Sequence, residues 1–214
     1  DHRDLHSFPT RRSSDLFLGK SYNTLVTADI ICHGVPSAAF FNKYIEWYEK
    51  KYNCKVKDFD FRSKENGRGT YAGICTIESG KKVQTRKIYY FNEYYYFYFL
   101  KSELFRDSCY HCKYANLSRP GDFTLGDFWG AQGQKLDFDT SNGCSLVLIN
   151  TEKAKSIFKD LNVYSSQVNL AFAVLNNTQL REPSKHTDFR NTLLRESREC
   201  SAEQQRKLRH RDYF

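Results

Sequence analysis

The sequence has no apolar run that approaches the length of a membrane-spanning helix. Its most aromatic stretch, Tyr89 to Leu100, is too short and contains Asn92 and Glu93. No secretion signal is visible ahead of the seven cysteines, so we expect a cytoplasmic, reducing environment with thiol or metal chemistry instead of disulfides. Nothing in the chain resembles a Ser–His–Asp triad, a P-loop or a paired-carboxylate site, which argues against the catalytic classes that use them.

The first sixteen residues, Asp1 to Leu16, show no apolar period and match the in-frame translation of a common short-read sequencing adapter. We treat 1–16 as a non-native scar, in preference to a basic arm or transit-like segment, and expect Phe17 not to be the true start. Without them, 198 residues remain, with 30 Lys and Arg against 22 Asp and Glu, a net charge of +8. This size suits one large domain or two small ones, and the charge predicts affinity for anions.

The pattern of apolar and turn-forming residues predicts a mixed sheet with flanking helices, in a single α/β domain that is truncated at its front. Leu25–Cys32 reads as a strand that breaks at Gly34 and Pro36, and Ser37 is a good N-cap for the following helix. That helix should run over 38–52 with an apolar face of Phe40, Phe41, Tyr44, Ile45 and Tyr48. The other expected elements are a strand at 55–62, a hairpin over 70–90 turning at Ser79–Gly80, a helix at 94–105, strands at 122–130 and 144–149, a helix from Asn150 or Thr151 to Leu161, and helices near 167–176 and 188–199.

Three of the cysteines are candidate metal ligands. Cys109 and Cys112 have the C-x-x-C spacing that lets one loop hold a zinc ion or an iron–sulfur cluster, and Cys32 lies where a strand enters a turn. The alternatives are a chance spacing, a buried strand thiol at Cys32, or a zinc knuckle completed by Cys32 with His33 or His111. Spacing alone favours zinc and iron–sulfur equally. We expect Cys75 and Cys144 to be core thiols, and Cys54 and Cys200 to be incidental.

Four segments occur in an order seen in one family: DIICHGVPS, FDFRSKENG, SCYHCKYANLSRPGDFTLGDFWG and GCSLVLINTEKAKSIF. The chain resembles the C-terminal domain of the coenzyme F420 hydrogenase/dehydrogenase beta-subunit family from about Phe17 to Leu161. We therefore expect such a domain at 17–165 and a helical C-terminal extension at 166–214. Members are iron–sulfur flavoproteins that pass electrons between a cluster, FAD and a partner-dependent acceptor. The acceptor is coenzyme F420 in some members, and others are linked to surface-polysaccharide pathways.

The resemblance implies that Cys32, Cys109 and Cys112 are three ligands of a [4Fe-4S] cluster. The fourth would come from a G-T-P-C-Q-type turn, which family members carry shortly before the position of Phe17. A three-cysteine remnant should bind a cluster weakly or lose iron from one corner, and we expect this chain alone to be inactive. The implied partners are other redox subunits or a ferredoxin-like electron donor.

The resemblance also implies a flavin, whose pyrophosphate requires backbone amides, a helix N-terminus and basic side chains. Each candidate residue has an ordinary alternative: a solvated surface charge for the basic ones, and a tight strand end with a capping carboxylate for Gly126 and Asp127. Trp129 is a further candidate for stacking, with a core position as its alternative, and His33 and His111 could tune the cluster or simply be hydrogen-bonded. The candidate cofactor-binding residues are His33, Gly34, Ser37, Arg62, Lys64, Arg119, Gly126 and Asp127.

Two functions of other classes compete with this interpretation. A zinc-stabilised binding module without catalysis would need no flavin and no fourth cysteine. Nucleic-acid binding would use the +8 charge and the tyrosines, but the charge is spread along the chain. The only compact basic run is the C-terminal RKLRHRDYF, so nucleic acid ranks last among the expected partners.

Overall fold

A computed structural model of the protein describes residues 24–61, 63, 72–141 and 143–199. The expectations for 1–16, Arg62, Lys64 and Cys200 lie outside the described residues. The predicted α/β class is confirmed, with two three-stranded sheets accompanied by helices. This small domain divides into two compact units, of which one comprises Asp1–Cys32 with Cys112–Pro183 and the other His33–His111 with Ser184–Phe214.

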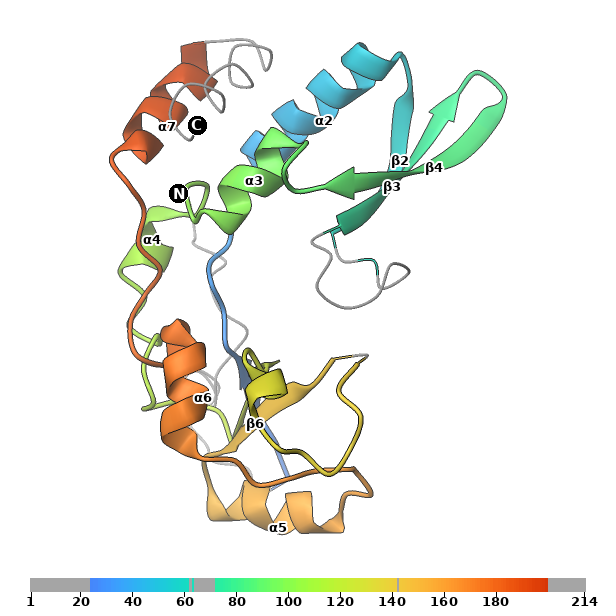
Figure 1. Ribbon diagram of the computed structural model, residues 1–214. Coiled ribbons are helices and arrows are strands. Elements are labelled where there is room, and N and C mark those ends of the chain that lie inside the picture. The colour runs from blue at the N-terminus through green and yellow to red at the C-terminus, as the bar shows by residue number, and fades with distance from the viewer. Residues whose placement is uncertain (1–23, 62, 64–71, 142, 200–214) are drawn as a thin grey trace. The chain divides into compact units, whose positions relative to one another are not determined.

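The first unit is built on a mixed sheet in the order β1-β5-β6. Strand β1 (Ala28–Ile30) runs parallel to β5 (Phe123–Asp127), and β5 runs antiparallel to β6 (Ser145–Ile149). Helices α5 (Glu152–Asp160) and α6 (Leu170–Asn176) follow the sheet in the chain, with short 3₁₀ turns η1 (Ala131–Gly133) and η2 (Thr178–Leu180) (Figure 1). Its core consists of Phe128, Ala131, Leu146, Ala173 and Leu180.

The second unit pairs an antiparallel sheet with an aromatic helix layer. The sheet has the order β2-β3-β4, and its β3–β4 hairpin closes where Ser79 pairs with Lys82. The hairpin extends away from α2 in Figure 1. The elements of this unit are α2 (Ala38–Tyr52), β2 (Lys55–Asp60), β3 (Ala72–Ser79), β4 (Lys82–Tyr89), α3 (Tyr94–Leu100), α4 (Asp107–Tyr110) and α7 (Phe189–Glu199).

Aromatic rings fill the core of the second unit, and Tyr44 lies at their centre with its side chain fully buried. Its ring stacks on Tyr95 at 5.4 Å and meets Tyr94 and Phe59 edge to face at 5.3 and 5.8 Å. The Tyr44 hydroxyl donates to Glu93 Oε2 at 3.2 Å. Burial, together with the Glu93 carboxylate, raises the pKa of Tyr44 far above its usual value. The many aromatic side chains of this sequence thus fill the core of the second unit.

Several expected elements are confirmed, and others differ in extent. The helix over 38–52 and the hairpin are as predicted, and Thr151 caps α5 by accepting from the Ala154 amide at 3.1 Å. The strand expected at 25–32 is shorter, and the helix expected at 94–105 ends at Leu100. It ends there because Ser102 takes a left-handed φ of 62° and donates its amide hydrogen to the Phe99 carbonyl.

Two local predictions, for Cys144 and Cys54, were wrong, and the N-cap prediction for Ser37 is confirmed only in its position. Ser37 precedes α2 as expected, but its side chain makes no capping hydrogen bond within the described chain. Cys144 lies outside β6 and is only half-buried, whereas Cys54 belongs to the aromatic core. Cys75 is a core thiol as predicted, and burial raises its pKa to about 11.

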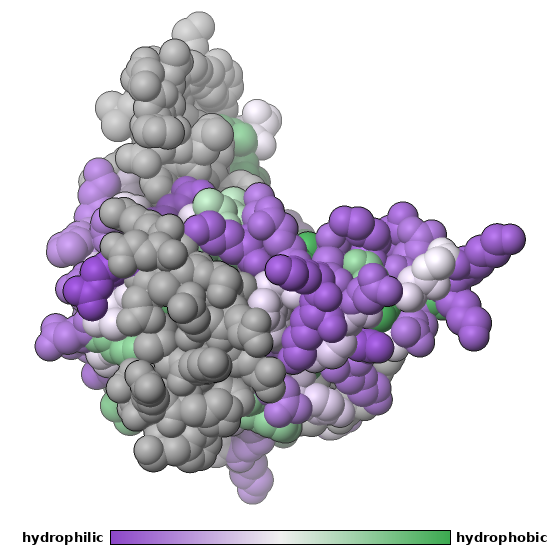
Figure 2. Space-filling view, turned by 90° about the horizontal axis from the view of Figure 1, so that it is seen from above, coloured by the Kyte–Doolittle hydropathy of each residue, from purple (hydrophilic) through white to green (hydrophobic). Residues whose placement is uncertain are grey.

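Fourteen large hydrophobic residues of the described chain are exposed, among them Ile30, Tyr164 and Leu175. On the face shown in Figure 2, the described residues are mostly hydrophilic, and hydrophobic ones appear in small groups. Among the described residues, no helix is both long and apolar enough to cross a lipid bilayer.

The central position of Tyr44 leads to a testable expectation. Replacing it by phenylalanine removes the donor to the buried Glu93 and should lower the free energy of unfolding by about 1–3 kcal/mol. Tyr164→Phe is the matched control, because Tyr164 is 95% exposed and its loss of a hydroxyl should have almost no effect. Urea denaturation monitored by circular dichroism measures both; equal stabilities of the two variants would contradict this role of the hydroxyl.

Candidate functional site

Two segments that are far apart in the sequence lie side by side in the second unit and carry one of the predicted ligands. Pro36 forms an isolated antiparallel bridge with Phe105, and the Val35 carbonyl accepts from the Arg106 amide at 3.0 Å. The Val35 amide donates to Cys109 Sγ at 3.3 Å. The turn after Cys32 and the loop that holds Cys109 therefore form one local structure.

Gly34 permits this close approach. Its φ of +152° is a conformation that residues with a side chain rarely adopt, and a Cβ atom there would lie 2.3 Å from Cδ2 of Phe105. The ring of Phe105 is buried and cannot move aside without disturbing its neighbours. The glycine of the C-H-G-V-P-S segment thus has a packing reason, independent of any ligand.

The C-terminal segment of the second unit holds the same loop in place. Arg190 Nη2 donates to the Phe105 carbonyl at 2.9 Å and pairs with Asp107 at 2.8 Å, and its guanidinium lies 4.9 Å from the Tyr110 ring centre. Arg190 is itself buried, so its bond to the Phe105 carbonyl is shielded from solvent, whereas the Asp107 side chain is 86% exposed. No local signal in the sequence pointed to this role, because Arg190 lies far beyond Cys109 in a helix that reads as an ordinary polar one.

Two further contacts of this segment involve the buried residues Glu103 and Ser184. The fully buried Glu103 accepts from the Thr187 hydroxyl at 2.8 Å and from the Thr187 amide at 3.2 Å. The Ser184 hydroxyl donates to the carbonyl of His33, which follows the candidate ligand Cys32 in the chain. Residues 184–190 therefore support the cysteine loop from outside the region where the family resemblance was evident.

The amide hydrogen bond to Cys109 has a chemical consequence. An amide that donates to sulfur stabilises negative charge on it, and such bonds tune the reduction potential of iron–sulfur clusters. Cys109 is half-buried near the end of α4, and the nearby His111 is exposed, with Nδ1 3.1 Å from the Asp107 carbonyl oxygen. The surroundings of Cys109 fit a metal-bound thiolate better than those of the buried core thiols.

The other two candidate cysteines belong to the first unit. Cys32 is exposed just beyond β1, and Cys112 is half-buried in a turn where its carbonyl accepts from the Ala115 amide at 3.2 Å. Within the described ranges, no three His, Cys, Asp or Glu side chains lie close enough together to hold a metal ion. The metal-ligand role of Cys32, Cys109 and Cys112 therefore stays a prediction.

Arg119, predicted to bind the flavin, is engaged within the first unit. Its Nε donates to Asp29 Oδ1 at 2.8 Å, Nη2 donates to the Ile30 carbonyl at 2.5 Å, and Nη1 donates to the Tyr114 carbonyl. Its side chain is only 5% exposed. Asp29 also accepts from the Gly121 amide at 3.0 Å. These contacts favour the structural alternative, in which Arg119 ties the loop before β5 to β1.

Asp122 is a second buried charge in this unit, and sequence reasoning missed it. Its carboxylate is fully buried, accepts from the Thr27 amide and hydroxyl at 3.0 and 3.1 Å, and accepts from the Thr151 hydroxyl at 2.8 Å. Lys153 Nζ lies 2.9 Å from it. Burial alone raises the pKa of Asp122, but Lys153 and the hydrogen bonds outweigh this effect and lower it to about 2. The sequence did contain a signal for it, since Asp122 is an acidic residue at the first position of the strand predicted at 122–130.

The remaining flavin candidates occupy ordinary structural positions. A Cβ atom at Gly126 would lie 2.8 Å from Ile31 Cβ, so packing across the sheet explains this glycine without a ligand. Asp127 ends β5 with an exposed side chain. His33 and Ser37 are exposed on either side of the Val35 turn, and Arg62 and Lys64 lie outside the described residues. Binding of a flavin by these residues stays a prediction.

Comparison with known families decides the relationship. The family described as the C terminus of the coenzyme F420 hydrogenase/dehydrogenase beta subunit matches residues 16–168, which is more than half of the chain. The chain belongs to this family. No curated protein and no solved structure matches the chain. The match includes Cys32, Cys109 and Cys112 and both halves of the Val35–Cys109 structure.

Membership of the F420 hydrogenase/dehydrogenase beta-subunit family confirms the resemblance seen in the sequence. It indicates a redox function of the hydrogenase/dehydrogenase beta-subunit type, which implies redox cofactors and redox partner subunits. The type of cluster, the flavin and the individual partners stay predictions.

The clash at Gly34 can be tested directly. Gly34→Ala should lower the free energy of unfolding by about 3 kcal/mol, because it combines an unfavourable φ with overpacking against Phe105. The matched control is Gly80→Ala, whose φ is also positive, at +61°, but whose Cβ would meet nothing within 4 Å. It should cost only about 1 kcal/mol. Chemical denaturation compares the two, and an equal cost would mean that Phe105 does not restrict position 34.

The low pKa of Asp122 predicts acid sensitivity. Because the folded-state pKa is about 2 and the ordinary value is 3.8, the stabilisation is complete above roughly pH 5 and is lost as the pH falls toward 2. It amounts to about 2 kcal/mol. Asp122→Asn should lower stability at neutral pH and flatten the stability profile between about pH 5 and pH 2.

The control for this experiment is Asp160→Asn, which alters an exposed carboxylate in α5 of the same unit. Thermal unfolding at a series of pH values would measure both variants. If the Asp122→Asn profile keeps the acid sensitivity of the wild type, the charge of Asp122 is not its source.

Proposed function

We propose that the chain is part of an iron–sulfur flavoprotein oxidoreductase that passes electrons between a [4Fe-4S] cluster, FAD and a partner-dependent acceptor. The observation that carries the proposal is the family match over 16–168, which spans all three candidate cysteines. The amide hydrogen bond to Cys109 Sγ supports it, since a thiolate ligand benefits from such a donor.

Cys32, Cys109 and Cys112 would hold the cluster, and a fourth cysteine would come from an upstream segment. The Val35 amide stabilises the sulfur of Cys109, and Gly34, Phe105 and Arg190 act as positioning residues that keep that amide in place. The cluster would supply one-electron transfer. The chain's own contribution is to fix the orientation of a ligand and to set the charge on its sulfur.

The flavin would be bound by residues around the N-terminus of α2. This helix has fifteen residues and no acidic residue in its first turn, so its N-terminus favours an anion such as a pyrophosphate. His33, Gly34 and Ser37 precede it, and Arg62, Lys64, Gly126 and Asp127 are the further candidates. Arg119 would act indirectly, by holding the Ile30 carbonyl two residues before Cys32. The flavin would supply the hydride chemistry.

The acceptor would be coenzyme F420 or another substrate that a partner brings, and a link to polysaccharide biosynthesis is one such context. Other redox subunits or a ferredoxin-like donor would supply electrons in the cytoplasm. A second candidate function is a zinc-stabilised binding module. The bond from Val35 to Cys109 favours it too, because zinc-bound thiolates accept the same kind of hydrogen bond.

Anaerobic reconstitution with iron and sulfide separates the two functions. The purified chain should take up iron and sulfide with the broad visible absorption of a cluster, and Cys109→Ser should abolish most of this uptake. Cys144→Ser is the matched control, because Cys144 is also half-buried but lies outside the candidate set. Elemental analysis, sulfide assay and electron paramagnetic resonance measure the outcome. Zinc without iron or sulfide, lost in Cys109→Ser, would instead establish the binding module.

A further inference from the structure

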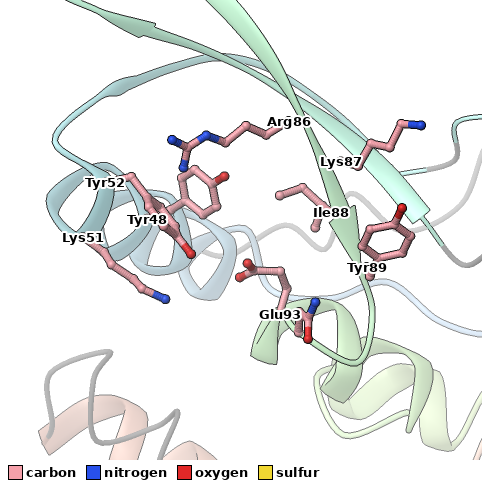
Figure 3. A pocket seen from close by; sticks show the side chains of 9 residues that line it. Tyr48, Lys51, Tyr52, Arg86, Lys87, Ile88, Tyr89 and Glu93 are labelled. Carbon is pink, nitrogen blue, oxygen red and sulfur yellow. The ribbon is translucent and has the colours of Figure 1, made fainter.

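A pocket of about 320 Å³ lies in the second unit, and none of its lining residues belongs to the loop that holds Cys109. Its walls come from the last turns of α2, from β4, and from the turn between β4 and α3 (Figure 3). All its lining residues lie within the described part of the chain. Those that matter for its chemistry are Tyr48, Lys51, Tyr52, Arg86, Lys87 and Glu93.

The pocket is electropositive. The lining residues include three cations, Lys51, Arg86 and Lys87, and one carboxylate, Glu93, a formal charge of +2, although the Lys87 side chain points away from the others in Figure 3. Among the described residues, neither Lys51 nor Arg86 forms an ion pair with a carboxylate. The two cations beside the pocket therefore keep their charge uncompensated by a fixed anion.

Aromatic rings hold these two cations in place. Lys51 Nζ lies 4.7 Å from the ring centres of both Trp47 and Tyr52, and the Arg86 guanidinium lies 4.9 Å from that of Tyr52. The Tyr52 ring in turn packs on Tyr48 at 4.5 Å. A cation that lies over a ring loses some of its mobility but keeps its N–H donors for another acceptor. Lys51 and Arg86 are thus each held against the Tyr52 ring, and both line the pocket.

Neutral and acidic groups complete the lining. Burial raises the pKa of Tyr48 to about 12, so its hydroxyl remains protonated near neutral pH and can donate a hydrogen bond. Glu93 is buried and already accepts from the Tyr44 hydroxyl. Its carboxylate makes the pocket unfavourable for a bare polyanion but provides an acceptor for a hydroxyl group on a ligand.

We propose that this pocket binds a small phosphate monoester that carries hydroxyl groups, of the pentose phosphate or nucleoside monophosphate class. Arg86 and Lys51 bind the phosphate, Tyr48 donates to it, and Glu93 accepts from a hydroxyl of the ligand. The volume lies at the lower end of the range for ligand pockets, which suits a ligand of this size and not a dinucleotide such as FAD. The inference stands independently of the proposed redox function, since it uses none of the candidate cysteines.

Isothermal titration calorimetry of the 214-residue chain with ribose 5-phosphate, AMP, ribose and inorganic phosphate tests this site. A phosphate monoester should bind, ribose should not, and inorganic phosphate should bind at least several-fold more weakly than the better ester. Comparison of ribose 5-phosphate with AMP shows whether a base contributes. The affinity should fall as the salt concentration rises, because part of it is electrostatic.

Two variants address the phosphate ligands separately. Arg86→Gln and Lys51→Gln should each weaken binding of the ester about tenfold or more, the loss expected for a charge-assisted hydrogen bond. Lys82→Gln is the matched control: it removes a cation from the same strand as Arg86 but outside the pocket, and should leave the affinity unchanged. Lys51 is exposed at the surface of α2, so its variant should fold even where Arg86→Gln does not.

Three results would overturn the proposal. The first is the absence of binding by both esters at millimolar concentration. The second is an affinity that Lys51→Gln and Lys82→Gln alter equally, which would indicate nonspecific attraction. The third is displacement of the ester by stoichiometric FAD, which would identify the pocket as part of a flavin site. Failure of cluster reconstitution would leave these measurements unaffected, so the two proposals fail independently.

Discussion

The contact between Gly34 and the Phe105 ring is the constraint on which the geometry around Cys109 depends. Since position 34 has no side chain, residues 33–36 can lie against residues 105–109, and the Val35 amide reaches the sulfur at 3.3 Å. Arg190 then binds the Phe105 carbonyl from a segment much later in the chain. The surroundings of the Cys109 sulfur are thus fixed by backbone contacts and a buried arginine, and not by the sequence of its own loop.

In the first unit, buried charged side chains hold the chain in place around β1. Asp29 lies in β1 and Asp122 immediately precedes β5, and each carboxylate binds one cation and one backbone amide. Removing one partner from such a pair would leave an uncompensated buried charge, so the arrangement is unforgiving of change. It joins β1, β5 and the start of α5, and thereby sets where the chain leaves β1 toward Cys32. Because β1 has only three residues, packing and helix capping without these buried charges would hold the junction much less firmly.

Regular elements could be predicted from the sequence, and the contacts between distant segments could not. The apolar face of Phe40, Tyr44 and Tyr48 and the turn at Gly80 act locally, so α2 and the hairpin lie where expected. Arg190 illustrates the opposite case: nothing in its neighbourhood reveals that it binds Phe105, because that contact exists only once the tertiary fold has formed. Arg119 illustrates a third. The sequence motif marked it as a candidate flavin ligand, but an arginine side chain suits a buried carboxylate as well as a phosphate, and its observed partner is the Asp29 carboxylate.

The cations behind the net charge of +8 also divide into those that bind acidic side chains and those that do not. Some cations, such as Arg119, Lys153 and Arg190, stabilise the fold through acidic partners and contribute little to the attraction of a ligand. Lys51 and Arg86 are different, since aromatic rings hold them and leave their donors unused by carboxylates. A polyanion would need many such cations along an extended surface, whereas two preorganised cations beside a pocket of about 320 Å³ match the charge and size of one phosphate group with a small substituent. The two cations at this pocket therefore favour a small anion over nucleic acid as its ligand.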